Sequence, residues 1–177
     1  MPRLLALCFA FAGLAACSKV DVAVIDAVRV EGYPARPALN DDEVAWRPPE
    51  TDFVRIDFRI DPELNQIPWS NHMQFFYDLH ACDAPDMYTH TGDVFVDLTR
   101  PDVYQAYVPA HFSNLHFWVT GGGSGQGGRG WPDEVQNERL CFRIYGGINY
   151  GWRVSSDAVP VQSLVEQFII DTGRAGQ

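Results

Sequence analysis

Alternation of apolar and polar side chains is the feature that most constrains how this chain can fold. The clearest case is the stretch 52–60, in which apolar residues alternate with charged ones: Val54, Ile56, Phe58 and Ile60 against Arg55, Asp57 and Arg59. A period of two residues is typical of a β-strand that buries one face. The same pattern predicts strands at 19–31, 71–82, 93–99, 104–108, 115–120 and 139–145, and short extended stretches around 152–154 and 158–161.

These stretches predict an all-β domain. Seven or eight strands, with turn residues between them and hardly any helical periodicity, favour an antiparallel β-sandwich. Within 19–31, Asp26 falls on the same parity as the valines, which predicts a β-bulge or a break in the strand at that point. Near the end of the chain, Ser163 and Glu166 form a capping box, so that a short C-terminal helix fits, with an edge strand as the alternative.

Two segments interrupt the strands. Residues 32–50 are rich in proline and are expected to be irregular, packed on the domain through Tyr33 and Trp46. The acidic run at 41–43 fits a solvated surface better than a cation site, because no further ligands flank it. Residues 121–130 contain seven glycines and a formal G-x-G-x-x-G match. We reject a dinucleotide site there, because no helix is expected to follow the glycines.

The first seventeen residues have the pattern of an export signal. Arg3 precedes an apolar run at 4–12, and two small residues then precede Cys17. The apolar run is shorter than the roughly 20 residues that a membrane-spanning helix needs. Cleavage after residue 16 would leave 161 of the 177 residues, the usual size of one domain, at 17–177.

Leu14-Ala15-Ala16-Cys17, followed by Ser18, resembles the lipobox of bacterial lipoproteins. The resemblance covers residues 1–18 and implies that the Cys17 thiol is acylated and becomes the mature N-terminus. It implies a lipid-anchored protein of the cell envelope. Ser18 after the cysteine favours the outer membrane, with the domain facing the periplasm.

The chain is acidic, with a formal net charge of −10, and only Arg3 among the charged residues would leave with the signal. An acidic surface argues against a nucleic-acid partner and against a polybasic membrane patch, so lipid is expected to hold the protein at the membrane. The sequence indicates no cofactor and sets no oligomeric state.

The cysteines predict one disulfide. With Cys8 removed and Cys17 acylated, Cys82 and Cys141 remain as an even pair in an oxidising compartment. Both lie on the polar parity of their strands, so we expect the bond on the outer face of one sheet, between neighbouring strands. If Cys82 lies directly opposite Cys141, then His80 faces Arg143 and Asp78 faces Tyr145.

The segment from Cys141 to Ile144, with a glycine turn and a last strand at 156–161, resembles the closing strands of fibronectin type III domains. That resemblance implies an immunoglobulin-like sandwich in which the third and sixth strands are neighbours, and this arrangement suits a bond between Cys82 and Cys141. The tryptophan usual in the second strand of that family is absent from 52–60.

No sequence motif for catalysis or for a metal site is present, and a catalytic triad assembled from distant residues stays open. We therefore predict a non-enzymatic module that binds or assembles with another envelope protein. The alternatives are a periplasmic hydrolase and a carbohydrate-binding module, both acting on envelope polymers. Candidate binding residues are the aromatics outside the inward parity and the polar cluster beside the disulfide: Phe76, Trp118, Trp131, Trp152, Asp78, His80 and Arg143.

Overall fold

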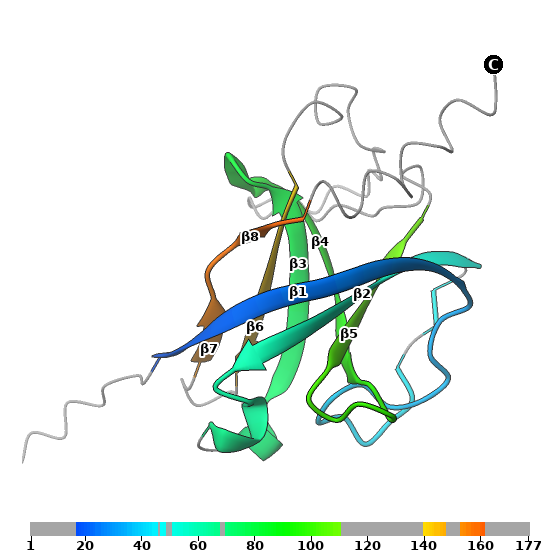
Figure 1. The fold of residues 1–177 in the computed structure, drawn as a ribbon, viewed down its shortest axis with the longest axis horizontal. Coiled ribbons are helices and arrows are strands. Elements are labelled where there is room, and N and C mark those ends of the chain that lie inside the picture. Colours follow the sequence, from blue (N-terminus) through cyan, green and yellow to red (C-terminus); the bar gives the residue numbers. More distant parts are fainter. Residues whose placement is uncertain are drawn as a thin grey trace, which may run out of the picture.

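The fold was analysed in a computed structural model, which describes residues 17–45, 47–48, 51–67, 70–110, 140–147 and 153–161 (Figure 1). These residues form eight strands and two short 3₁₀ helices. The strands are β1 (Cys17–Glu31), β2 (Asp52–Asp61), β3 (Gln74–Ala81), β4 (Ala84–Val96), β5 (Tyr104–Pro109), β6 (Leu140–Gly147), β7 (Arg153–Ser156) and β8 (Val159–Pro160). The helices are η1 (Leu64–Gln66) and η2 (Ser70–His72), both between β2 and β3.

The prediction of an all-β chain is confirmed, but the predicted sandwich is wrong, because the sheet closes into a barrel. The strands pair in the order β3-β4-β5-β2-β1-β7-β6, and β6 pairs back with β3. All of these pairs are antiparallel except β1 with β7. Because β3 pairs with β6, the strands associated with Cys82 and Cys141 are neighbours, as predicted.

Closure depends on two long strands that change partners along their length. The first four residues of β1 pair with β7, and β1 pairs with β2 from Asp21 onward. In the same way, β4 pairs with β3 up to Asp93 and with β5 from Val94. A strand shared in this way joins what would otherwise be two separate sheets. Alternation cannot reveal the sharing, because it reports which face is buried and not which strand lies alongside.

The irregularity predicted in β1 is a bulge, and beyond it the inward and outward faces of the strand are exchanged. Val24 pairs with Phe58 whereas Asp26 pairs with Asp57, so that Ile25 is the extra residue. One inserted residue moves every later side chain to the opposite face. Ala27 therefore enters the core beside Ile56, although the valines before and after the bulge share one parity in the sequence.

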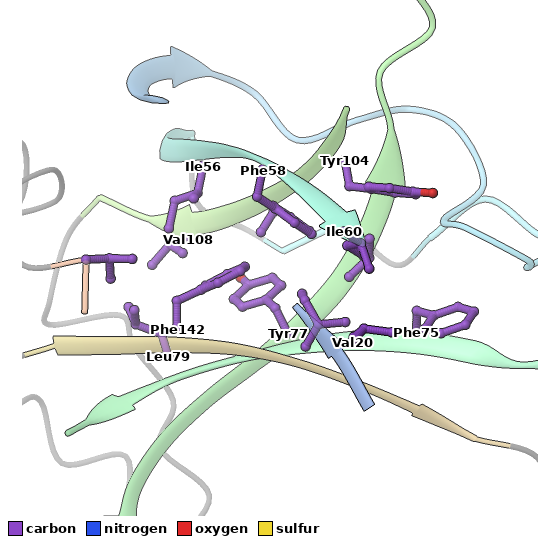
Figure 2. Packing of buried hydrophobic residues seen from close by; sticks show 14 of the residues in the cluster. Val20, Ile56, Phe58, Ile60, Phe75, Tyr77, Leu79, Tyr104, Val108 and Phe142 are labelled. Atoms are coloured by element: carbon purple, nitrogen blue, oxygen red, sulfur yellow. The ribbon is translucent and has the colours of Figure 1, made fainter. Parts of the chain in front are cut away.

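The core lies inside the barrel and is built by the side chains that alternation assigned to the inward face (Figure 2). Phe142 from β6 packs against Phe58 at a ring-centroid distance of 5.1 Å and stacks on Tyr77 at 5.8 Å. Gly92, opposite Tyr77 on β4, is required there, because a Cβ would lie 2.6 Å from the tyrosine ring. The predicted inward residues of 52–60, 71–82 and 139–145 are confirmed: Val54, Ile56, Phe58, Ile60, Met73, Phe75, Tyr77, Leu79, Leu140, Phe142 and Ile144. Tyr104, Ala106 and Val108 of β5 also lie in this core.

The prediction for β4 is wrong at both ends. The strand begins at Ala84 and ends at Val96, whereas alternation predicted 93–99. Pro85 and the lack of alternation hid the first part. Beyond Val96, Asp97 accepts hydrogen bonds from Thr99 in a turn, and Leu98 is 81% exposed instead of inward.

The predicted packing of 32–50 is confirmed for Tyr33, whose ring contacts Phe53, Phe95 and Tyr107 on the outer face of β2, β4 and β5. The Leu39 amide donates a hydrogen bond of 2.7 Å to the Val94 carbonyl, where β4 passes from one partner to the other. The predictions for Trp46, the stretch 115–120, the glycine-rich loop 121–130 and the C-terminal helix lie outside the described residues.

Candidate functional site

The disulfide between Cys82 and Cys141 is present and joins the neighbouring strands β3 and β6, as predicted. The predicted register is wrong by two residues. His80 pairs with Cys141 and Asp78 pairs with Arg143, so that Cys82, just after β3, reaches Cys141 diagonally. A shift of two residues keeps each side chain on the same face of the sheet, so the disulfide still lies on the outer face, as predicted.

The predicted polar cluster beside the disulfide is real, but it is buried. Asp78 is 4% exposed and His80 is 1% exposed. The Asp78 carboxylate accepts two hydrogen bonds from Arg143 at one oxygen and one from the Thr91 hydroxyl at the other. Both oxygens of Asp78 are thus engaged in holding strands β3, β4 and β6 together.

The predicted binding aromatics are only partly described. The ring of Phe76 packs against Tyr145 on the outer face, with a centroid distance of 5.6 Å, and is half-buried. Trp118, Trp131 and Trp152 lie outside the described residues.

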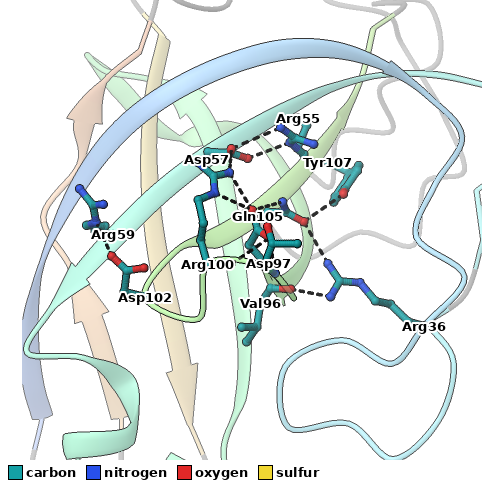
Figure 3. A network of polar contacts seen from close by, with 11 residues as sticks. Arg36, Arg55, Asp57, Arg59, Val96, Asp97, Arg100, Asp102, Gln105 and Tyr107 are labelled. Carbon is teal, nitrogen blue, oxygen red and sulfur yellow. Dashed lines mark hydrogen bonds and ion pairs between the residues drawn. The ribbon is translucent and has the colours of Figure 1, made fainter.

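A second outer-face network was missed by the sequence analysis (Figure 3). The Arg100 guanidinium donates to the carboxylates of Asp57 on β2 and Asp97 after β4. Gln105 on β5 extends this network, because its amide nitrogen donates to Asp97 and its oxygen accepts from Arg36. The only signal in the sequence was polar residues on outward parity, which any solvated face would also carry.

This network and the neighbouring aromatic cluster shift two carboxyl groups in opposite directions. The pKa of Asp97 is held well below its usual range by the Thr99 hydroxyl, the Thr99 amide and the Arg100 guanidinium. Burial raises the pKa of Asp93, although the Tyr33 hydroxyl donates a hydrogen bond to it. The arrangement explains how residues 33–36 and the turn at 97–103 are attached to the outer face of the barrel.

Among the described residues, one open groove of about 570 Å³ lies at one end of the barrel. Its walls come from three places that are far apart in the sequence: the loop at 39–40, the helices η1 and η2, and the ends of β4 and β5. The groove is lined by Leu39, Asn40, Leu64, Asn65, Gln66, Ile67, Ser70, Asn71, Val96, Pro101 and Tyr104. None of these eleven residues carries a charge, although 20% of the chain is charged.

One hydrogen bond joins two walls of this groove. The Asn40 side-chain amide donates to the Ser70 carbonyl at 2.6 Å, which fixes the loop against η2. Asn40 has a φ of +60°, and among the described residues it is the one non-glycine residue with a positive φ. Asparagine tolerates this left-handed conformation better than most residues do, and such conformations cluster at functional sites.

A second open hollow, of about 730 Å³, lies at the opposite end of the barrel, where β1 ends and β2 begins. It is lined by Glu31, Gly32, Tyr33, Arg47, Pro48, Thr51 and Asp52, so charges of both signs surround it. Arg29 and Asp52 form an ion pair beside it at 2.7 Å.

Among the residues that the structure describes, no three His, Cys, Asp or Glu side chains are placed to hold a metal ion. None of the described helices is long and apolar enough to cross a membrane. Comparison of the chain with protein-family models, with curated protein sequences and with solved structures finds no match in any of the three.

Proposed function

We propose that this protein is a lipid-anchored module of a bacterial cell envelope, acylated at Cys17, whose barrel binds another envelope protein without catalysing a reaction. The lipobox at 14–17 supports the anchor. The observation that carries the proposal is that β1 begins at Cys17, which pairs with Arg153 of β7. An acyl group on Cys17 would then attach directly to the barrel wall, with no spacer between lipid and sheet.

Such an attachment would also orient the domain. Cys17 pairs with Arg153, Arg153 with Gly147, and Gly147 with Gln74, so these residues form one row across four strands. We call the end of the barrel marked by this row the Cys17 rim. It would face the membrane, and the end with Glu31 and the disulfide would face away from it (Figure 1).

The polar cluster beside the disulfide gives no support to the hydrolase alternative. A general base needs a free lone pair within reach of its substrate. Asp78 instead has both oxygens engaged by Arg143 and Thr91, and it is almost fully buried. These groups suit a structural role.

The anchor is tested by metabolic labelling with a palmitate analogue. Cys17→Ser is expected to abolish the label and release the protein from the membrane fraction. The matched control is the double variant Cys82→Ser, Cys141→Ser, which removes the two disulfide-bonded cysteines and leaves Cys17, and it should remain labelled. Persistent labelling of Cys17→Ser would overturn the anchor.

Binding is tested by crosslinking in intact cells, followed by capture of the full-length protein from detergent-solubilised envelopes. An envelope protein is expected in the captured material of the wild type, and much less of it with Cys17→Ser. Retention of envelope glycan with no protein would favour the carbohydrate-binding alternative and contradict the proposal.

A further inference from the structure

The uncharged groove at the Cys17 rim has an unusual concentration of amide side chains. The described residues contain six Asn and Gln residues, and four of these line the groove. All four are exposed: Asn40, Asn65, Gln66 and Asn71. An amide both donates and accepts hydrogen bonds without carrying a charge, so four of them around one mouth favour a neutral ligand with alternating donors and acceptors.

Much of the hydrogen-bonding capacity of these amides remains available. The nitrogens of Asn40, Asn65 and Asn71 contact Ser70, Glu63 and His72 respectively. Within the described part of the chain, the side-chain carbonyl oxygens of these three asparagines make no hydrogen bond, and neither does the side-chain amide of Gln66. The Asn40 contact ties the loop at 39–40 to η2.

We propose that this groove binds an extended, uncharged peptide segment of the partner protein. The amides would pair with the peptide backbone, and the apolar surface of Leu39, Val96 and Pro101 would receive an apolar side chain. The inference rests on the proposed binding function and names its ligand. Because the groove lies at the Cys17 rim, the segment would come from a protein close to the same membrane.

A peptide fits this lining better than a glycan does. Sugar sites commonly offer an exposed aromatic face, and among the described residues of the lining the one aromatic residue is Tyr104. Tyr104 is 5% exposed, its ring stacks on Phe58, and its hydroxyl accepts a hydrogen bond from the Leu64 amide. Tyr104 therefore closes the floor of the groove and presents no stacking surface.

The test uses the full-length protein in detergent and follows the side-chain NH₂ signals of Asn and Gln by NMR. The peptide probe is N-acetyl-leucine N-methylamide, and the glycan probe is methyl N-acetylglucosaminide. A fragment of the size of the peptide probe is expected to bind with a Kd of about 1 mM. It should shift the Gln66 and Asn71 signals along one saturable curve, and the sugar should leave them unchanged.

Substitutions locate the binding. Gln66→Leu with Asn71→Leu, whose binding is followed by the Asn40 and Asn65 signals that remain, is expected to weaken binding about tenfold, as the loss of two hydrogen bonds predicts. Gln74→Leu is the matched control, because Gln74 is an exposed amide at the same rim that does not line the groove. It should bind as the wild type does, and amide spectra of each variant report that the fold is intact.

Shifts caused by the sugar and not by the peptide would overturn the peptide assignment, and so would the absence of shifts with either probe. If Gln74→Leu weakened binding of the peptide probe as much as the double variant does, the groove would not be its binding site. Palmitate labelling is measured on the same preparation, so that absence of probe binding in the groove is distinguished from absence of acylation at Cys17.

Discussion

Asp78 and Arg143 lie directly opposite each other on β3 and β6, and the Arg143 guanidinium donates two hydrogen bonds, of 2.8 and 2.9 Å, to one carboxylate oxygen of Asp78. The Asp78 side chain is 6% exposed and the Arg143 side chain is 37% exposed. The pair is thus a desolvated carboxylate that depends on a partly solvated cation.

Replacing Arg143 with Leu is expected to lower the free energy of unfolding by about 2–3 kcal/mol, because it leaves a buried carboxylate without its cation. Urea unfolding at neutral pH measures the change. Lys19→Gln is the control, since Lys19 and Asp157 form a pair that is mostly exposed, and its unfolding midpoint should not move. Equal effects of the two substitutions would show that Arg143 does not stabilise Asp78.

The two shifted carboxyl groups predict opposite dependences on pH. The pKa of Asp97 is lowered in the folded protein, so its contribution to stability is present above the unfolded pKa of about 4 and is lost as the pH falls below it. Asp97→Asn should therefore destabilise the protein at pH 7, by about 1–2 kcal/mol for the weakened hydrogen bonds. The difference from wild type should shrink as the pH falls below about 4.

Asp93→Asn is compared with Asp97→Asn, because Asp93 lies on β4 and Asp97 directly follows that strand. The pKa of Asp93 is raised by burial, so the folded state favours its neutral form, and stability is lost as the pH rises through that pKa. An uncharged Asn at this position should cost nothing, or stabilise, at pH 7. Unfolding curves between pH 3 and 7 test both variants. If the stabilities of the two variants relative to wild type changed with pH in the same way, the opposite pKa shifts of Asp93 and Asp97 would be contradicted.

Gly92→Ala is expected to destabilise the protein by about 1–3 kcal/mol, because the new methyl group overlaps the ring of Tyr77 in a packed core. A double-mutant cycle with Tyr77→Leu identifies the cause. Removing the ring should make Gly92→Ala much less costly, which gives a coupling energy of about 1 kcal/mol or more. Additive effects would mean that the backbone at Gly92, and not Tyr77, sets the cost.

Loss of the disulfide is expected to lower the free energy of unfolding by about 4 kcal/mol, because the bond closes a loop of 59 residues in the unfolded chain. The double variant Cys82→Ala, Cys141→Ala should show this loss in urea. Reductant should shift the wild-type midpoint toward that of the variant and leave the variant unchanged. Alkylation of both thiols without reductant would show that the bond does not form.

Much of the barrel could be predicted from local patterns. A buried face shows directly in the sequence when a strand is regular, so the inward residues of β2, β3 and β6 follow from alternation alone. The partners in the disulfide follow from counting cysteines. The first half of β4 could not be predicted, because Pro85 interrupts a stretch without alternation.

The candidate site was much less predictable. The cluster at Asp78, His80 and Arg143 was placed on the correct face, but its burial depends on packing that parity does not report. The groove was missed entirely. Its lining comes from residues as distant as Leu39 and Tyr104, and no spacing in the sequence relates them.

The sequence by itself determined where most of the described strands lie, which side chains several of them bury and which cysteines pair, because each of these depends on side-chain chemistry read locally. The tertiary structure alone decided the ring of strands, the register between β3 and β6, the face of β1 after Ile25 and the groove at the Cys17 rim. These features depend on backbone hydrogen bonds between strands. Every residue except proline can donate and accept such bonds, so the choice of partner leaves almost no trace in residue identity.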